Sequence, residues 1–196
     1  MEAEAKFEAP TWNQIYTMLR REAEKIRCSG FKPDVVVGVT RGGWIPARIL
    51  ADLLGIGKLA TVGVEFYLGV AETLSEPVLT QGVSVDIRGK KVLLVDDVAD
   101  TGKSLMLARK HLQQRGAAEI QVATVYCKLL SVVAPDYYEK ETGCWVVFPW
   151  DAKENVRKIL EHGSVVNVEV AELVKAGLPK QLVEEFLKEE GEAGKC

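Results

Sequence analysis

The sequence lacks most features that mark membrane, secreted, zinc-binding or nucleic-acid-binding proteins. Its four cysteines, at positions 28, 127, 144 and 196, are spaced for neither a zinc site nor a Cys-x-x-Cys pair. Free thiols are the simplest expectation, and a disulfide stays open for a hyperthermophilic source. No apolar run approaches the length of a membrane span, and the acidic N-terminus has no signal-peptide pattern. These absences favour a cytoplasmic protein.

Charge of one sign is not in excess either. The 25 Lys and Arg residues nearly balance the 28 Asp and Glu residues, for a net charge of −3 over 196 residues. No basic face for nucleic acid or an anionic membrane is therefore indicated. The length suits one domain with a sizeable core, or one domain with a small appendage.

The most informative stretch that is present covers residues 92–104. The run Val92–Val95 is wholly apolar, which is typical of a buried parallel strand, and it ends on Asp96 and Asp97. Ligands of open α/β sheets bind at the carboxyl ends of strands, so these carboxylates are expected at a binding edge. The turn Asp100–Ser104 then opens a helical pattern, and its backbone N–H groups and hydroxyls predict an anion site. This layout suits a phosphate beside a sugar diol.

Apolar runs alternate with amphipathic segments over the first 151 residues. This order predicts an α/β fold with a doubly wound parallel sheet. Expected helices cover residues 12–27, 44–54 and 103–114, and expected strands cover residues 35–39, 59–66, 92–95, 120–126 and 145–148.

Two regions depart from that alternation. Residues 67–90 have mixed polarity and no clear period, and Val83–Asp86 is expected to be a strand of a hairpin there. After Asp151 the pattern is helical, over about 151–160, 168–175 and 177–190. We expect residues 1–151 to form the core, with a hood at about 65–90, and residues 152–196 to form a helical extension of the same domain.

Residues 92–104 resemble the PRPP-binding motif of the type I phosphoribosyltransferases, an apolar strand followed by two acids and a Thr-Gly-x-Ser/Thr turn. The resemblance implies the type I fold and an enzyme that transfers the phosphoribosyl group of PRPP to a base and releases pyrophosphate. It assigns the ribose hydroxyls and Mg²⁺ to Asp96 and Asp97. It assigns the 5′-phosphate to Ala99, Asp100, Thr101, Gly102, Lys103 and Ser104. Among these, the Lys103 side chain is expected to point into solvent and to contribute least.

The turn formed by Thr40, Arg41, Gly42 and Gly43 resembles the pyrophosphate loop of bacterial xanthine-guanine phosphoribosyltransferases, which has Ser at the first position. Glycines free the backbone N–H groups to donate to the leaving group, and Arg41 adds charge and a forked donor. A peptide bond in this loop can be cis in that family, which the sequence leaves undetermined for this chain.

Asp100 and Lys128 are the two residues from which a 6-oxopurine substrate is expected. In that branch of the family, an Asp at the place of Asp100 accepts a proton from N7 of the base, and a Lys at the place of Lys128 binds the exocyclic O6. A cation suits a 6-oxo group and is mismatched to the 6-amino group of adenine. Capping of the following helix is an alternative or additional role for Asp100, and an ordinary surface position is the alternative for Lys128.

The segment from Trp145 to Asp151 resembles the base-binding segment of the family. The resemblance implies that Trp145 stacks on the purine, that Val146 binds it through its backbone, and that Asp151 joins a magnesium site. For Asp151, the N-cap of the next helix is an equally good interpretation. Trp150 is expected in the core or in an interface.

We therefore expect a purine-salvage phosphoribosyltransferase that uses PRPP and Mg²⁺, acts on hypoxanthine, guanine or xanthine, and forms a homodimer or higher homo-oligomer. Its products are pyrophosphate and the nucleoside 5′-monophosphate. One alternative is an adenine enzyme, against which Asp100 and Lys128 argue. Another is a non-catalytic nucleotide-sensing regulator that binds RNA, against which the absence of a basic face argues. An orotate enzyme is less favoured, because its Lys-rich hood is missing.

Overall fold

The computed structural model describes residues 6–67, 76–161 and 166–193. The chain divides into two compact units. One contains residues 16–143, and the other joins the residues up to Ile15 with those from Cys144 onward. Helix α1 (Trp12–Cys28) begins in the second unit and continues into the first. Within the described ranges, no helix is long and apolar enough to cross a membrane.

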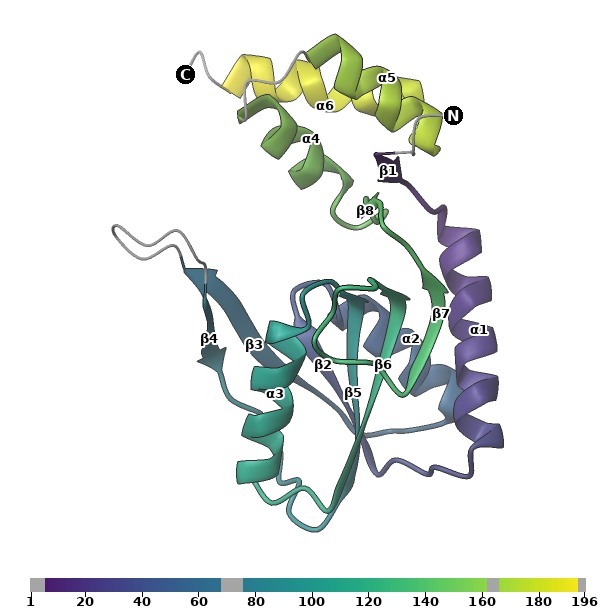
Figure 1. The fold of residues 1–196 in the computed structure, drawn as a ribbon, viewed down its shortest axis with the longest axis vertical. Helices are drawn as coiled ribbons and strands as arrows, with labels where there is room; N and C mark the ends of the chain where they lie inside the picture. The colour runs from purple at the N-terminus through teal and green to yellow at the C-terminus, as the bar shows by residue number, and fades with distance from the viewer. Residues whose placement is uncertain (1–5, 68–75, 162–165, 194–196) are drawn as a thin grey trace. The chain divides into compact units, whose positions relative to one another are not determined.

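A six-stranded sheet forms the centre of the unit from 16 to 143 (Figure 1). Its order is β4-β3-β2-β5-β6-β7, and every neighbouring pair is parallel except β3 with β4. The strands are β2 (Val35–Thr40), β3 (Leu59–Tyr67), β4 (Glu76–Gln81), β5 (Lys91–Ala99), β6 (Glu119–Cys127) and β7 (Tyr137–Glu141). The expected doubly wound parallel sheet is confirmed.

Two helices cover the sheet, α2 (Trp44–Leu54) and α3 (Lys103–Gln114). Alternate residues of β2, such as Val35 and Val37, are buried in one cluster with the apolar residues of α3. Gly38 faces the other way, because a Cβ placed there would lie 2.9 Å from the Cβ of Ala47 in α2. Side chains of a strand alternate between faces, so each face of β2 packs against a different helix. This explains why its sequence is apolar throughout.

The strand predictions differ from the structure at four places. β5 continues through Asp96 and Asp97 to Ala99, whereas the sequence predicted that this strand ends at the two acids. The hairpin partner of β3 is β4 at Glu76–Gln81, whereas Val83–Asp86 forms no strand and buries Val83 in the core cluster beneath α3. Strand β7 was not predicted at all. The strand expected at 145–148 is β8 (Trp145–Val146), and it pairs with β1 (Phe7–Glu8) in a separate two-stranded sheet.

The unit that contains β1 and β8 is otherwise helical. It holds α4 (Ala152–Glu161), α5 (Val166–Ala176) and α6 (Lys180–Ala193). Phe7, Val147, Val156, Leu173 and Val183 lie at the centre of its hydrophobic cluster. Phe186 and Leu187 pack against the same cluster, as the amphipathic stripe of this last helix predicted.

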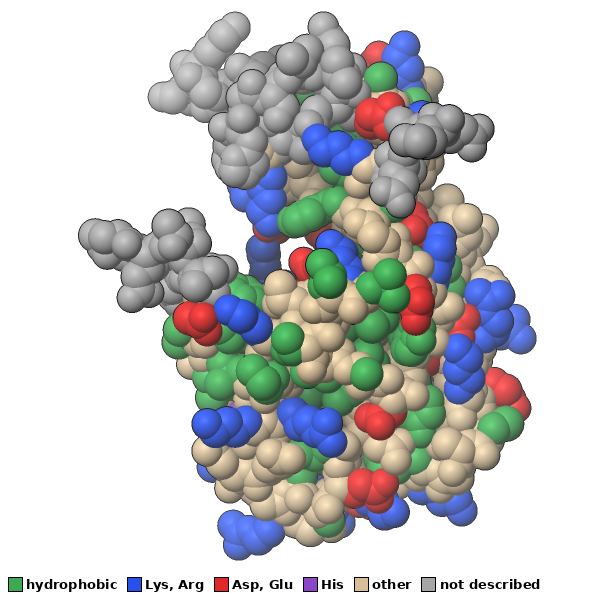
Figure 2. Space-filling model, viewed as in Figure 1, with side chains coloured by type: hydrophobic (Ala, Val, Ile, Leu, Met, Phe, Trp, Pro, Cys, Tyr) green, Lys and Arg blue, Asp and Glu red, His purple; other side chains and the backbone are tan. Residues whose placement is uncertain are grey.

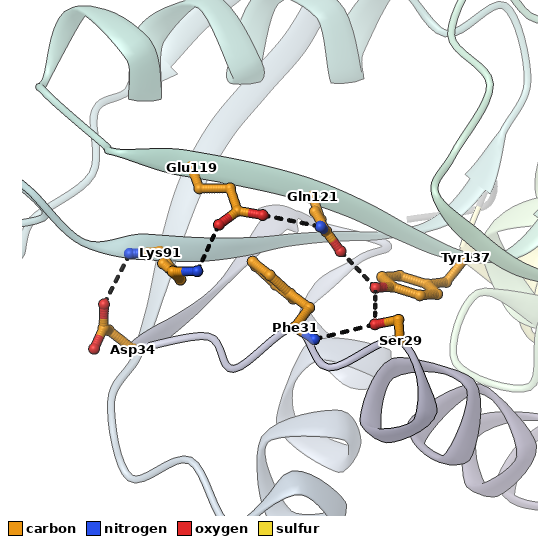
Figure 3. A network of polar contacts seen from close by, with 7 residues as sticks. All are labelled: Ser29, Phe31, Asp34, Lys91, Glu119, Gln121 and Tyr137. Carbon is orange, nitrogen blue, oxygen red and sulfur yellow. Dashed lines mark hydrogen bonds and ion pairs between the residues drawn. The ribbon is translucent and has the colours of Figure 1, made fainter.

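A polar network ties together the starting ends of β5, β6 and β7 (Figure 3). Lys91 Nζ contacts Glu119 Oε2 at 2.8 Å, and Gln121 bridges Glu119 to the hydroxyl of Tyr137. Ser29, just after α1, completes it with its Oγ 2.6 Å from Tyr137 Oη. These contacts fix the edge at which the strands begin. The opposite edge, where the parallel strands end, is the one at which open α/β sheets bind ligands.

Helix α1 is joined to β7 by charged groups around a buried acid. Arg21 and Lys25 both bind the carboxylate of Glu139 on β7, at 2.7 and 2.8 Å. Glu22 lies between these two residues in sequence, is fully buried, and has no hydrogen-bond partner for its carboxyl oxygens within the described part of the chain. Burial, and next the nearby Glu139, raise the pKa of Glu22 well above its usual value, while Lys25 opposes this shift.

Glu22→Gln is expected to stabilise the protein at neutral pH. A carboxyl whose folded-state pKa is raised contributes stability that is fully present below its unfolded pKa of about 4.3 and is lost as the pH rises through the folded value. The neutral amide escapes that loss, so the free energy of unfolding should rise by about 1–2 kcal/mol at pH 7 and change little at pH 4. Urea unfolding at both pH values checks this, with Glu185→Gln at an exposed position of α6 as the control. An equal effect at both pH values would refute the protonation argument.

Candidate active site at the carboxyl ends of the strands

Five of the residues predicted to bind PRPP line one pocket, whereas Asp97, Ala99, Lys103 and the loop from Thr40 to Gly43 are not among its lining residues. It has a volume of about 250 Å³ and opens beside the end of β5. Its walls include Phe66, Asp96, Asp100, Thr101, Gly102 and Ser104. Asp96 in β5 and the turn residues after β5 are therefore brought together, at the edge where α/β sheets bind ligands.

The turn between β5 and α3 is held from outside by the loop after β6. Gly102 has a φ of +78°, and a Cβ there would lie 2.6 Å from Ser131 Oγ. The N–H of Val132 donates to the carbonyl oxygen of Thr101 at 2.9 Å. Since glycine alone adopts this φ readily and fits this space, Gly102 allows the turn to approach the loop after β6 closely. The predicted binding of a phosphate at the start of α3 stays a prediction.

Asp96 and Asp97 lie against the predicted pyrophosphate loop. The carboxylate of Asp96 accepts the N–H of Asp97 at 3.0 Å and a backbone hydrogen bond from Gly43. Burial, and next the charge of Asp97, raise the pKa of Asp96 well above its usual value. A cation or sugar hydroxyls bound here would relieve this unfavourable pairing of acids.

The pyrophosphate loop fits closely onto the end of β5. The peptide bond between Thr40 and Arg41 is cis. A Cβ at Gly42 would lie 2.1 Å from Asp97 Oδ2, and one at Gly43 would lie 2.4 Å from the carbonyl oxygen of Val95. The two glycines thus let the loop approach both acids, which is a packing reason for the Gly-Gly pair beside any role in binding pyrophosphate.

Asp100 and Lys128, expected at N7 and O6 of the base, form an ion pair of 2.9 Å. The backbone N–H of Lys128 also donates to the carbonyl oxygen of Ala99 at 3.0 Å. Gly102 occupies the N-cap position of α3, and the N–H of Lys103 donates to Thr101 Oγ1 at 3.4 Å rather than to Asp100. The capping alternative for Asp100 is therefore wrong, and its carboxylate faces Lys128 instead.

Two residues that the sequence did not single out lie at this site. Phe66, near the end of β3, is 47% exposed and lines the pocket. Glu76, at the start of β4, accepts from Lys103 Nζ at 2.9 Å. Lys103 thus contacts the hairpin of β3 and β4, whereas the sequence analysis predicted that its side chain points into solvent. An exposed aromatic at the end of a strand was the signal available for Phe66.

Trp145, Val146 and Asp151 belong to the other unit, and the structure describes them only within it. Trp145 is 48% exposed, whereas Val146 is buried. Asp151 precedes α4, and its carbonyl oxygen accepts the N–H of Asn155 at 3.0 Å, as at an N-cap. Their predicted roles in binding the base and Mg²⁺ stay predictions. Trp150 stacks on Phe148 with ring centroids 4.7 Å apart, as expected of a packing residue.

Residues 11–157 match the family described as the phosphoribosyl transferase domain. The chain belongs to this family, in its 6-oxopurine branch. It is 31% identical over 145 residues to a xanthine-guanine phosphoribosyltransferase of Nitratidesulfovibrio vulgaris, a match that covers 73% of this chain and 83% of that protein.

Solved structures agree with this assignment. A purine phosphoribosyltransferase from Pyrococcus horikoshii is 41% identical, with a TM-score of 0.67 over 74% of this chain and 94% of that one. A hypothetical protein from Neisseria gonorrhoeae with bound ppGpp is 26% identical, with a TM-score of 0.69 over 86% of this chain and 99% of that one. The type I fold expected from the sequence is confirmed.

Proposed function

We propose that this phosphoribosyltransferase transfers the 5-phosphoribosyl group of PRPP to a 6-oxopurine base in purine salvage. The observation that carries the proposal is the Asp100–Lys128 ion pair at the rim of the phosphate pocket. A 6-oxopurine presents O6 and N7 side by side on one edge. A cation for O6 and a carboxylate for N7 therefore match that edge, whereas adenine would place its amino group against the Lys128 ammonium.

The proposed reaction forms the bond between N9 of the base and C1 of the ribose, while the bond from C1 to pyrophosphate breaks. The proton leaves N7 of the base for the carboxylate of Asp100. The turn at 99–104 holds the 5′-phosphate, and Asp96 and Asp97 hold the ribose hydroxyls. The loop from Thr40 to Gly43 donates backbone N–H groups to the departing pyrophosphate.

Magnesium fits the donors at this site. Within the described ranges, no three or more His, Cys, Asp or Glu side chains converge as a complete metal site. Asp96 and Asp97 supply two carboxylates, which suits Mg²⁺ because that ion keeps several waters and bridges substrate phosphates. When bound, it would neutralise charge on the diphosphate of PRPP.

Chelation of divalent ions is expected to abolish turnover. PRPP carries its leaving group as a polyanion, and the nearby carboxylates of Asp96 and Asp97 are themselves acidic, so a divalent cation is needed to offset the negative charge. With excess EDTA, pyrophosphate release should fall at least about 100-fold, and added Mg²⁺ should restore it. A rate that is unchanged in EDTA would remove the metal from the proposal.

A base panel tests the proposed substrate. Hypoxanthine, guanine, xanthine and adenine are each incubated with PRPP and Mg²⁺, and pyrophosphate release is measured. The 6-oxopurines are expected to react and adenine to fail. Lys128→Ala should lower kcat/KM for 6-oxopurines about 10–100-fold because O6 loses its cationic partner, whereas Lys110→Ala on the exposed face of α3 should not. Adenine as the best substrate would contradict the role of Lys128.

A non-catalytic nucleotide sensor remains the second candidate, because the Neisseria relative was crystallised with ppGpp. That nucleotide combines a guanine edge with phosphate groups that the two loops could hold. The face in Figure 2 intersperses Lys and Arg with Asp and Glu, which gives no support to RNA binding there. Binding of ppGpp without turnover of any base would favour the sensor over the enzyme.

Self-association and a cytoplasmic location remain predictions. Leu129, Leu130 and Val132 are 79%, 92% and 68% exposed in the loop after β6, and such side chains are ones that an oligomer would bury. Light scattering on the purified protein would decide between a monomer and a homodimer or higher oligomer.

A further inference from the structure

Strand β4 lies at the edge of the six-stranded sheet, so its place depends on what holds it beside β3 and α3. Most of its residues are exposed. Leu79 is partly buried and packs against the core cluster that includes the apolar residues of α3. In Figure 1, β4 runs beside α3, and the two elements are in contact. Because β4 buries little apolar surface, its polar contacts with α3 have a large share in positioning it.

Two polar contacts join this strand to α3, one near each end. Glu76, its first residue, accepts a hydrogen bond from Lys103 Nζ in the first turn of the helix. Just past its other end, the backbone N–H of Val83 donates to Nε2 of His111 in the last turn of the helix, at 3.1 Å. A Cβ at Gly82 would lie 3.2 Å from that same nitrogen. The chain therefore passes directly against the imidazole where it leaves β4.

The hairpin of β3 and β4 forms part of the pocket to which we assign PRPP. Phe66 of β3 is paired with Pro77 of β4, and Phe66 lines that pocket. Ser104, in the first turn of α3, lines the same pocket. The shape of the pocket therefore depends on how the hairpin is fixed relative to α3.

We propose that His111 is a positioning residue for PRPP binding. By accepting the N–H of Val83, it fixes the β3–β4 hairpin against α3 and so holds Phe66 at the wall of the pocket. The inference rests on the proposed function, which assigns this pocket to PRPP. His111 lies at the opposite end of α3 from the phosphate turn, so it acts through the hairpin and not on the substrate. A wall that is fixed in advance spares the cost of ordering it when the substrate binds.

This contact requires the neutral imidazole. A backbone N–H can only donate, so Nε2 must be unprotonated and the ring proton must lie on Nδ1. Burial, and next the charge of Arg115, lower the pKa of His111 from its usual value. The ring is therefore neutral and the contact intact at pH 7. As the pH falls below the usual histidine value of about 6.5, protonation removes the acceptor and the contact is lost.

The surroundings of the ring favour the neutral form. Arg115 lies one turn further along α3 and is the one charge among the described residues that shifts the pKa of His111. Asp86 and Arg88 line a cavity together with Arg115, and neither contributes to that shift. Towards β4 the ring meets the uncharged backbone at Val83, and the strands beneath α3 present the apolar side chains of the core cluster.

The test compares KM for PRPP with kcat in three variants. His111→Ala removes the acceptor, so KM for PRPP should rise about 5–10-fold, the cost of one hydrogen bond. Its kcat should stay within about 2-fold, because the groups proposed to act in the reaction are unchanged. His111→Gln places an amide oxygen near the position of Nε2 and should keep KM within about 2-fold of the wild type. Lys110→Ala, at the neighbouring exposed position of α3, is the control and should leave KM unchanged.

The pH dependence supplies a readout that a purely structural side chain would not move. The Gln variant shares every other titrating group with the wild type, and the substrate is the same, but position 111 no longer titrates. The ratio of KM for PRPP in the wild type to that in His111→Gln should therefore be about 1 at pH 7.5 and rise at least about 2-fold at pH 5. A ratio that stays constant over this range would overturn the proposal.

The remaining outcomes are also decisive. An unchanged KM for PRPP in His111→Ala, or a Gln variant as impaired as the Ala variant, would refute the positioning role. If His111→Ala does not fold, the pH comparison decides alone, because it uses only the wild type and the Gln variant. A wild type that turns over no base with PRPP would refute the proposed function and this inference with it. An active wild type with a constant KM ratio would refute the inference alone.

Discussion

Asp100→Asn is expected to lower kcat about 10²–10³-fold, because the amide cannot take the proton that leaves N7 of the purine. The side chain keeps its size, so the pocket around it should keep its shape. The 5′-phosphate turn contributes its backbone through Thr101 and Gly102, and these groups are unchanged. KM for PRPP should therefore stay within about 3-fold of the wild-type value. Steady-state kinetics with a 6-oxopurine as the base measure both quantities.

The control for this prediction is Asp52→Asn, which removes the same charge at an exposed position near the C-terminal end of α2, whereas the pyrophosphate loop lies at the N-terminal end of that helix. It should leave kcat unchanged. If Asp100→Asn keeps the wild-type kcat, Asp100 is not the proton acceptor. If it instead raises KM for PRPP strongly while kcat is kept, the residue acts in phosphate binding.

The centre of the fold was predictable because its sequence signals are local. The bounds of α2 and α3 match the prediction, since each helix begins after a glycine-containing turn. The strands that were buried on both faces were recognisable by continuous apolar runs, which cover most of β2 and the first half of β5. The second half of β5, from Asp96 to Ala99, was not predicted as strand because two acids interrupt the run. The same locality explains why the sequence alone predicts that the phosphate turn and the two acids lie at one sheet edge.

The edges of the sheet could not be predicted, because exposed strands lack that signal. β7 reads Tyr-Tyr-Glu-Lys-Glu, and three of its five residues are charged. β4 contains Pro77 and is mostly exposed, which is typical of an edge strand. β1 and β8 are two residues each, and they pair across more than 130 positions of sequence. Such a pairing cannot be predicted from local sequence patterns, because it depends on the tertiary structure.

The candidate site shows the same division. The residue types and their spacing predicted which side chains take part in the reaction. The contact between Asp100 and Lys128, however, depends on the register of β5 against β6. The contacts of Gly43 with the backbone of β5 likewise depend on how β2 and β5 are aligned. The register between neighbouring strands is therefore the part of this site that could not be predicted from the sequence.

Gly43→Ala is expected to impair both stability and PRPP use. The added Cβ would lie 2.4 Å from the carbonyl oxygen of Val95, and 2.8 Å from both Asp96 Cα and the carbonyl oxygen of Val39. All three are backbone atoms of neighbouring strands, so no flexible side chain can move aside. The loop must shift, which should lower the free energy of unfolding by about 2–3 kcal/mol. Because the backbone of Gly43 also bonds to Asp96, kcat/KM for PRPP should fall at least about 10-fold.

Gly57→Ala is the matched control, since a Cβ at Gly57 would meet no atom within 4 Å. Urea unfolding and PRPP kinetics on both variants distinguish the general effect of an added methyl group from the effect of adding it at the crowded position of Gly43. If Gly43→Ala has the same free energy of unfolding and the same kcat/KM as Gly57→Ala, the pyrophosphate loop can accommodate a methyl group. The close fit of the pyrophosphate loop onto the two acids would then not be what holds the site together.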